Sequence, residues 1–303
     1  MTWDLRGKTV LITGAARGIG AETARRAAAA GANVALVGLE PEELRRVAAQ
    51  CGSNAAAFEC DVTDWQALEQ AVEGTVERFG GIDVVMANAG IAPAGMVRSV
   101  DPAAFERTVE INLLGVWRTV RASLPQVIER RGYVLVTASL AAAVHGPGMA
   151  AYSAAKAGAE AFADSLRVEV KHLGVDVGVA YFGFIDTDMV RGADTHPTLG
   201  QIRANTGGPI AKTYPVSKVG KAVVEGMEKR SRWVVVPGWA RPLIGLGRLL
   251  QPLTERFSYD QAVEVDRAFI EDVANRGVEA ASAPIGAGGD AVSTSDREPA
   301  GST

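Results

Sequence analysis

The sequence contains little of what several classes of protein require. It has two cysteines, Cys51 and Cys60, which form no CxxC pair, and three scattered histidines. These are too few for a metal site. No run of eighteen apolar residues occurs, and the N-terminus lacks the charged and apolar regions of a signal peptide. Together these absences predict a cytoplasmic protein with reduced thiols and no bound metal.

An excess of positive charge is also missing. The 303 residues carry a formal net charge of -4, with 48% hydrophobic and 22% charged residues. Without a basic field, binding to nucleic acid or to anionic lipid is disfavoured, and a small neutral or weakly acidic partner fits better. The length and the apolar content are those of an ordinary globular enzyme.

What the sequence does contain is a regular alternation of short apolar runs and helical patterns. The apolar runs lie at residues 10–13, 33–38, 55–60, 82–86, 133–138, 175–181 and 233–237. This order predicts the α/β class: a doubly wound, Rossmann-type sheet of seven mostly parallel strands with helices on both faces. Since no linker interrupts residues 1–237, we expect one domain there.

Three segments depart from that alternation. Residues 183–215 are rich in Gly, Thr and Pro and predict a lid. Residues 238–278 predict a helical extension, whose first part, 239–257, could lie on a membrane surface or pack over the substrate cleft or a neighbouring subunit. Its glycines and prolines interrupt a long helix and favour packing. Residues 279–303, mostly Ala, Gly, Ser and Thr, predict a disordered tail.

The first strand leads into a glycine-rich turn. Thr13 is followed by Gly14, Gly18 and Gly20, and an alanine-rich helical pattern comes next. Strand, glycine turn and helix stand in the order of a nucleotide-binding unit, in which glycines let the backbone approach a pyrophosphate at the helix N-terminus. The spacing differs from G-x-G-x-x-G, and such a turn can also serve tight packing alone.

A second motif joins a tyrosine to a lysine. On a helix predicted over residues 150–173, Tyr152 and Lys156 lie four residues apart and therefore share a face. A nearby ammonium favours the phenolate, which makes Tyr152 a usable general acid and base. Ser139 follows a buried strand, where its hydroxyl can hydrogen-bond a substrate carbonyl. Taken alone, YxxxK is also common on solvated helix faces.

Taken together, the motifs resemble the short-chain dehydrogenase/reductase family. Four signals stand in that family's order: residues 13–20, the Asn88-Ala89-Gly90 run, Asn112, and Ser139 with Tyr152 and Lys156. The resemblance covers roughly residues 5–237. It implies an oxidoreductase that transfers a hydride between a nicotinamide cofactor and a carbonyl or alcohol, with the hydride chemistry carried by the cofactor.

The resemblance also implies a role for each motif residue. Tyr152 would donate or accept the proton, and Ser139 would orient the carbonyl. Lys156 would lower the tyrosine pKa and hold the nicotinamide ribose, and Asn112 would anchor a water of a proton relay. The expected cofactor contacts are Gly14, Arg17, Gly18, Ile19, Gly20, Asp61, Val62, Asn88, Ala89, Gly90, Tyr152, Lys156, Ile185 and Thr187.

The end of the second strand bears on the choice of cofactor. Gly38 stands where an NAD-preferring member would place an aspartate, so nothing there repels the extra phosphate of NADP. Arg17 can approach that phosphate. Glu40 lies two positions past Gly38 and would instead hold a ribose, although Pro41 indicates that the chain has already turned. The sequence therefore favours NADP, with NAD as the alternative.

Three further expectations concern the substrate, the assembly and a rival function. Phe182 replaces the usual proline after the sixth strand and changes how the lid begins. Pairing of the long helices predicted at 101–131, with a kink at Pro125, and at 150–173 would give a homodimer or homotetramer. A catalytically silent sensor or scaffold of the same fold is disfavoured, because all four catalytic positions are filled. Apolar residues around the expected cleft suggest a hydrophobic substrate: Val144, Met149, Phe182, Phe184 and Met189.

Overall fold

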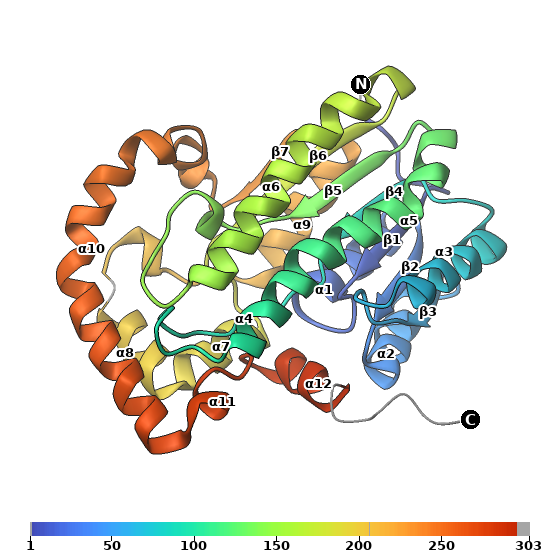
Figure 1. Cartoon of the computed structure of the whole chain (residues 1–303). Helices are drawn as coiled ribbons and strands as arrows, with labels where there is room; N and C mark the ends of the chain where they lie inside the picture. Colours follow the sequence, from blue (N-terminus) through green and yellow to red (C-terminus); the bar gives the residue numbers. More distant parts are fainter. Residues whose placement is uncertain (1, 206, 296–303) are drawn as a thin grey trace.

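Seven β-strands form one parallel sheet in the computed structural model, which describes residues 2–205 and 207–295 (Figure 1). The strand order is β3-β2-β1-β4-β5-β6-β7, and every neighbouring pair is parallel. This confirms the predicted doubly wound sheet. The strands are β1 (Thr9–Thr13), β2 (Asn33–Gly38), β3 (Ala55–Glu59), β4 (Val84–Ala87), β5 (Tyr133–Thr137), β6 (Asp176–Phe182) and β7 (Trp233–Val236).

Helices cover both faces of the sheet, so its central strands are buried on both sides. All residues of β1, β4 and β5 are buried, which explains why these strands are continuous apolar runs in the sequence. One core lies beneath α1 (Gly18–Ala29), α2 (Pro41–Cys51) and α9 (Val216–Glu228). The other lies beneath α3 (Trp65–Phe79), α5 (Gly115–Glu129) and α6 (Ala150–Val170).

The helices begin where their first residues satisfy the free backbone N–H groups. Asp64 accepts hydrogen bonds from Gln66 N at 2.8 Å and Ala67 N at 3.2 Å, and so caps α3. Pro41 is the first residue of α2, a position where its missing N–H costs nothing. Because these signals are local, the sequence predicts such helix starts well.

Strand order reverses at the centre of the sheet. β1 pairs with β2 on one side and with β4 on the other, so the connections leave β1 and β4 in opposite directions. In open α/β sheets a crevice forms at this point, outside the carboxyl ends of the strands. The glycine turn after β1 and the Asn88-Ala89-Gly90 run after β4 meet there.

The long helix predicted over residues 101–131 is not continuous. It consists of α4 (Pro102–Val109), a π-helical turn η1 (Glu110–Leu114) and α5, within which Pro125 lies. The π-helical turn contains Asn112. Such turns insert one extra residue into a helix and are frequent at functional sites, and periodicity alone cannot detect so short an insertion.

The predicted lid is more regular than its composition suggests. Two short helices, α7 (Asp188–Thr195) and α8 (Pro197–Asn205), occupy most of it, followed by the turn η4 (Pro209–Ala211). α8 contacts the long C-terminal helix α10 (Arg241–Arg276). Contacts with distant elements therefore order a segment whose own sequence predicts a loop.

The extension is one long helix rather than an interrupted one. α10 runs through Gly245, Gly247 and Pro252, so the prediction that these residues break it is wrong. A glycine costs a helix about 1 kcal/mol and a proline about 3 kcal/mol, whereas burying one large apolar side chain contributes about 1.5–3 kcal/mol. Val265 and Phe269 of α10 are both almost fully buried. In the described part of the chain, no helix is long and apolar enough to cross a membrane.

The prediction of a disordered tail does not hold for residues 279–295. Two helices follow α10, namely α11 (Val278–Ala281) and α12 (Ala287–Ser295). Val292 belongs to the larger core and is only 6% exposed. Because a single apolar residue anchors α12, no apolar periodicity marks it in the sequence. Residues 296–303 of the predicted tail lie outside the described residues.

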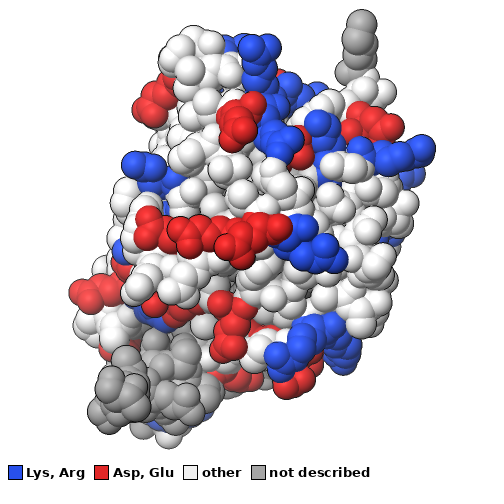
Figure 2. Space-filling model, turned by 90° about the vertical axis from the view of Figure 1, so that its right-hand side faces the viewer, with Lys and Arg blue, Asp and Glu red and all other residues white. Residues whose placement is uncertain are grey.

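Charges of both signs are interspersed on the surface. Figure 2 shows acidic and basic side chains alternating on the side of the molecule that lies at the right of Figure 1, near α2 and α3. On α2, Arg45 pairs with Glu42 and Arg46 pairs with Glu43, each one helical turn apart. This face therefore has no field of a single sign.

Candidate active site

The glycine turn brings the backbone of β1 against the end of β4. Gly14 has φ of +65°, and a Cβ atom there would lie 2.8 Å from Ala89 Cα. A Cβ atom on Gly20 would lie 2.2 Å from the carbonyl oxygen of Gly14. Neither position has room for a side chain, so the turn requires glycine at both. Gly20 packs against the backbone of the turn and does not line the large cavity beside it, whereas Gly14, Gly18 and Ile19 do.

Thr13 and Asn88 hold the two strand ends together. Thr13 Oγ1 accepts hydrogen bonds from Asn88 N at 3.0 Å and from Ala89 N at 3.2 Å. Asn88 Nδ2 donates to Thr13 O at 3.0 Å. These bonds fix the walls of the crevice at the point where the strand order reverses. Thr13 is absent from the predicted contacts, although its place as the last residue of β1 was a usable signal.

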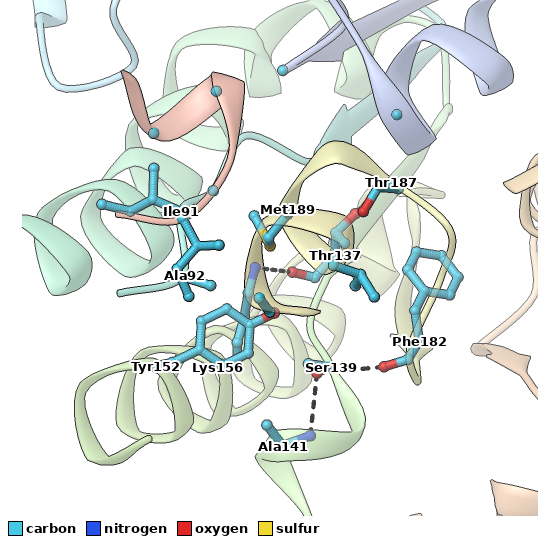
Figure 3. Close-up of a pocket in the computed structure, with 18 of the residues that line it drawn as sticks. Ile91, Ala92, Thr137, Ser139, Ala141, Tyr152, Lys156, Phe182, Thr187 and Met189 are labelled. Carbon is cyan, nitrogen blue, oxygen red and sulfur yellow. Dashed lines mark hydrogen bonds between the residues drawn. The ribbon is translucent and has the colours of Figure 1, made fainter. Parts of the chain in front are cut away.

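Tyr152, Ser139 and Lys156 converge on the same cavity. Figure 3 shows the Tyr152 ring directed toward Ser139, with Lys156 behind it. Ser139 Oγ donates to Phe182 O at 3.4 Å and accepts from Ala141 N at 3.2 Å. The strand end β5 supplies the serine and the first turns of α6 supply the other two residues, as the sequence predicts.

The electrostatics around Tyr152 differ from the expectation. Burial raises the pKa of Tyr152, and hydrogen bonding with Ser139 opposes that rise. Lys156 Nζ lies 5.7 Å from the Tyr152 ring centroid and donates to Thr137 O at 2.9 Å. Burial lowers the pKa of Lys156 to about 8. Hydrogen bonding with Ser139 thus favours the phenolate, against the effect of burial.

Asn112 is close to the site but does not line the cavity. Its Oδ1 accepts from Ile91 N and its Nδ2 donates to Ile91 O, both at 2.8 Å, and the residue is fully buried. A Cβ atom on Gly90 would lie 2.9 Å from Asn112 Oδ1. The side-chain amide is thus occupied by the backbone that follows β4, where it fixes the path of residues 90 and 91.

Arg17 is held by two carboxylates. Its Nε donates to Glu40 Oε2 at 3.1 Å, its Nη2 pairs with Glu40 Oε1, and its Nη1 donates to Asp188 Oδ2 at 3.2 Å. These bonds, led by the one with Glu40, raise the pKa of Arg17 above its ordinary value. Arg17 and Glu40 both line the cavity, beside Gly38. The guanidinium that the sequence offers to a phosphate already has partners within the chain.

The remaining predicted contacts surround this end of the cavity. Asp61 and Val62 line it, but the Asp61 carboxylate is bound to Thr63 Oγ1 at 2.8 Å and to Arg107 Nη2 at 3.1 Å. Ile185 and Thr187 line it from the segment after β6. A Cβ atom on Gly18 would lie 3.3 Å from Thr187 Cγ2, so the lid starts against the glycine turn.

The cavity continues from the glycine turn past Tyr152 to the lid. Its volume is about 590 Å³. Phe182 pairs with Val236 in the sheet, so the residue that replaces the usual proline extends β6 by one pair. The lid end of the cavity also includes Gln261 of α10. All five apolar residues expected at the substrate cleft line it: Val144, Met149, Phe182, Phe184 and Met189.

Two cavity features were absent from the sequence predictions. Thr137 supplies the carbonyl that holds Lys156, and the tail residues Ile285, Gly288 and Val292 line the cavity beside the glycine turn. Thr137 lies in a predicted strand two residues before Ser139, which was a usable signal. No sequence pattern marks the tail residues. Among residues 2–205 and 207–295, no cluster of three His, Cys, Asp or Glu side chains is arranged for a metal.

Comparison with known proteins agrees with the family resemblance of the sequence motifs. Residues 8–198 match the short chain dehydrogenase family. The chain is 40% identical over 156 residues to short-chain dehydrogenase reductase 5 of Arabidopsis thaliana, a match that covers 50% of this chain and 60% of that protein. It is 33% identical over 189 residues to the 3-oxoacyl-[acyl-carrier-protein] reductase FabG of Escherichia coli (strain K12), covering 62% and 78%.

Two other proteins extend the comparison. The chain is 35% identical over 194 residues to the trans-4-hydroxycyclohexanecarboxylate dehydrogenase of Sinomonas cyclohexanicum, covering 61% of this chain and 75% of that protein. A crystal structure of a short chain dehydrogenase/reductase from Burkholderia phymatum in complex with NAD superposes with a TM-score of 0.73, at 20% identity, over 83% of this chain and 96% of the other. Since the family match spans the glycine turn and the Tyr152 helix within more than half of the residues, this chain belongs to the short chain dehydrogenase family.

Proposed function

We propose that this protein transfers a hydride between a nicotinamide cofactor and a carbonyl or alcohol substrate. The observation that carries the proposal is a single cavity that joins the glycine turn to Ser139, Tyr152 and Lys156. The residues present fit a dinucleotide, because Gly14 and Gly18 line the cavity without a side chain and leave the backbone of the turn open to approach. The cofactor would supply the hydride.

The chain's own residues would manage the proton. In the direction of reduction, the Tyr152 hydroxyl gives its proton to the carbonyl oxygen while the carbonyl carbon receives the hydride. Ser139 Oγ is placed to hydrogen-bond the same oxygen. Lys156, held by Thr137 O, keeps a positive charge near the phenolate that remains. Asn112 fixes the backbone at Ile91, which lines the cavity, and its predicted role in a water relay stays part of the proposal.

Replacing Tyr152 with phenylalanine tests the proton transfer. Tyr152→Phe keeps the ring and removes the acidic proton, so turnover should fall by about 10²–10⁴-fold while the cofactor still binds. Turnover is measured from nicotinamide absorbance with a panel of ketones, aldehydes and alcohols, and binding by calorimetry. Tyr259→Phe makes the same change at a residue that is 72% exposed, and it should leave both quantities unchanged. Near-parent turnover in Tyr152→Phe would refute the assignment.

We propose that Glu40 decides between the two nicotinamide cofactors. The absence of a carboxylate at Gly38 favours NADP, as the sequence suggests. The contacts of Arg17 favour NAD, because a 2′-phosphate would have to displace Glu40 from the guanidinium. Around this position three carboxylates, Glu40, Asp186 and Asp188, face two guanidinium groups, Arg17 and Arg191. That surplus of negative charge opposes a further phosphate, so of the two we propose NAD.

Neutralising Glu40 tests this choice. In Glu40→Gln, Arg17 loses its closest charged partner, and the ratio of the NADP to the NAD dissociation constant should fall by about tenfold or more. The parent should bind NAD more tightly than NADP. Glu42→Gln changes an exposed glutamate two residues away on α2 and should leave the ratio unchanged. Tighter binding of NADP by the parent would restore the preference that the sequence suggests.

We also propose a hydrophobic body for the substrate. The cavity wall near Tyr152 is formed by Val144, Met149 and Phe184, which offer contact but few hydrogen bonds. Two relatives are named for a 3-oxoacyl-[acyl-carrier-protein] and for trans-4-hydroxycyclohexanecarboxylate. Substrates of both shapes, an acyl chain and a ring, therefore belong in the test panel.

A silent sensor of the same fold is the rival proposal. It predicts tight cofactor binding and no turnover with any member of the panel, whereas the enzyme proposal predicts turnover that Tyr152→Phe abolishes. The complete set of Ser139, Tyr152 and Lys156 around one cavity favours the enzyme.

A further inference from the structure

The C-terminal tail passes across the side of the cavity where the cofactor would bind. Ile285, Gly288, Gly289 and Val292 line the cavity together with Arg17 and the Asn88-Ala89-Gly90 run. In Figure 3 the salmon ribbon of the tail runs beside Ile91 and Ala92, and Ile285 N donates to Ala92 O at 3.4 Å. The tail thus adds a wall that the strands and the lid do not supply.

Val292 anchors this wall in the protein interior. It is 6% exposed and belongs to the same core cluster as Val62 and Ile91, two residues that also line the cavity. α12 also contacts α7 of the lid. An isolated helix of nine residues is unstable in water, so these tertiary contacts, Val292 above all, keep α12 in place.

The turn before α12 fits closely against the start of the lid. Gly286 has φ of +78°, and a Cβ atom there would lie 2.6 Å from the carbonyl oxygen of Asp188. A Cβ atom on Gly192 would lie 2.7 Å from Ile285 Cγ2. A Cβ atom on Gly288 would lie 3.8 Å from Arg17 Cδ. Gly286 therefore brings the tail against Asp188, and Gly288 lies next to Arg17, to which Asp188 is bound.

We propose that residues 285–292 form the outer wall of the dinucleotide site and that this wall must swing away for the cofactor to bind or leave. The inference rests on the proposed function, because it assumes that a nicotinamide dinucleotide occupies the cavity. Val292 in the larger core, Ile285 against the cluster of Ala94, Val265 and Phe269, and backbone contacts hold the wall in place. Opening it requires local unfolding of α12, with the sheet intact.

Weakening the anchor tests whether the wall controls cofactor release. Val292→Ser removes apolar contacts and places a hydroxyl in the core, so the opened wall should become more populated. The dissociation rate of the reduced cofactor, followed by its fluorescence in stopped flow, should rise about tenfold, equivalent to about 1.4 kcal/mol. Val278→Ser makes the same change at the first residue of α11, which is 43% exposed, and it should leave the rate unchanged. Equal rates in Val292→Ser and the parent would overturn the inference.

Hydrogen exchange of the parent protein gives a second readout that no variant can confound. Cofactor beneath the wall should slow exchange of the amides of residues 285–292, with no such effect on the exposed start of α11. Unchanged exchange in a parent that binds cofactor would also overturn the inference and leave the proposed function standing. If the parent binds neither NAD nor NADP, the proposed function itself fails. The two failures are therefore distinguishable.

Discussion

At the scale of single residues, burial changes the pH at which Lys156 loses its positive charge. Its side chain is almost fully buried, Thr137 O accepts its hydrogen bond at 2.9 Å, and burial lowers its pKa to about 8. A lysine in water stays charged to well above that pH. The proposed binding of the nicotinamide ribose by Lys156 therefore depends on pH within the range where enzymes are assayed.

Cofactor binding should weaken in alkaline solution for this reason. The charged form of Lys156 predominates below pH 8 and is lost as the pH rises through about 8. If only the protein with a charged Lys156 binds the cofactor well, the dissociation constant of the cofactor should rise about tenfold between pH 7 and pH 9. Calorimetric titrations across this range would measure it. Lys156→Met should bind weakly and without that pH dependence, and a flat profile in the parent would contradict the prediction.

At the scale of elements, His196 joins the lid to the C-terminal helix. Its Nδ1 accepts from Thr198 N at 3.3 Å and from Leu199 N at 3.4 Å, and so caps α8. Its Nε2 lies 2.9 Å from Arg276 Nη2 and 3.8 Å from Asp272 Oδ2, both on α10. Burial first, and then Arg276, lower the pKa of His196, while Asp272 opposes them. Because a neutral imidazole has one acceptor nitrogen, Nδ1 caps α8 and the proton lies on Nε2, which faces α10.

Acid should therefore loosen the lid. Because the folded pKa of His196 lies below its unfolded value, the unfolded form binds the proton more readily, and stability is lost as the pH falls through about 6.5. Protonation also removes the acceptor that caps α8. Amide exchange in α8, corrected for its intrinsic pH dependence, should be faster at pH 5.5 than at pH 7.5.

Two variants sharpen this prediction. His196→Asn keeps a capping oxygen but cannot titrate, so the difference between the two pH values should disappear. His172→Asn replaces an exposed histidine in the turn η3 (Lys171–Leu173) after α6 and should retain the difference. Equal protection of α8 at both pH values in the parent would show that His196 does not govern the lid.

At the scale of the whole molecule, apolar side chains remain exposed on the helices predicted to pair. Trp117 of α5 is 42% exposed and stacks on Trp65 at 5.8 Å between ring centroids. Val168 of α6 is 79% exposed, and Leu114 and Leu173 are also exposed. Exposed apolar residues on neighbouring helices are typical of protein interfaces. They support the proposal of a homodimer or homotetramer with closed symmetry.

The oligomer can be measured directly. The chain has a mass of 31.6 kDa, so light scattering should give about two or four times that mass. Val168→Lys places a charge on α6 and should shift the population toward smaller species. Val97→Lys makes the same change at a 71% exposed position in the segment after β4 and should not. A parent of single-chain mass at all concentrations would refute the proposal.

The sequence by itself determined the order of strands and helices and the residue types at the candidate site. Strand burial, glycine turns and the four-residue spacing of Tyr152 and Lys156 are local properties, and local properties can be read along the chain. The resemblance to the family rested on the same short motifs. For this reason the doubly wound sheet and the grouping of Ser139 with Tyr152 were predictable.

Contacts between distant residues decided the rest. Arg17 meets Asp188 across 171 positions, and this contact, together with Glu40, changes what the arginine can offer a cofactor. Val292 packs a tail without apolar periodicity against the core, and the side-chain amide of Asn112 hydrogen-bonds the backbone of Ile91. In each case the partner comes near only after the sheet has formed. A residue's charge, hydrogen bonds and burial depend on that partner, and the sequence around the residue does not identify it.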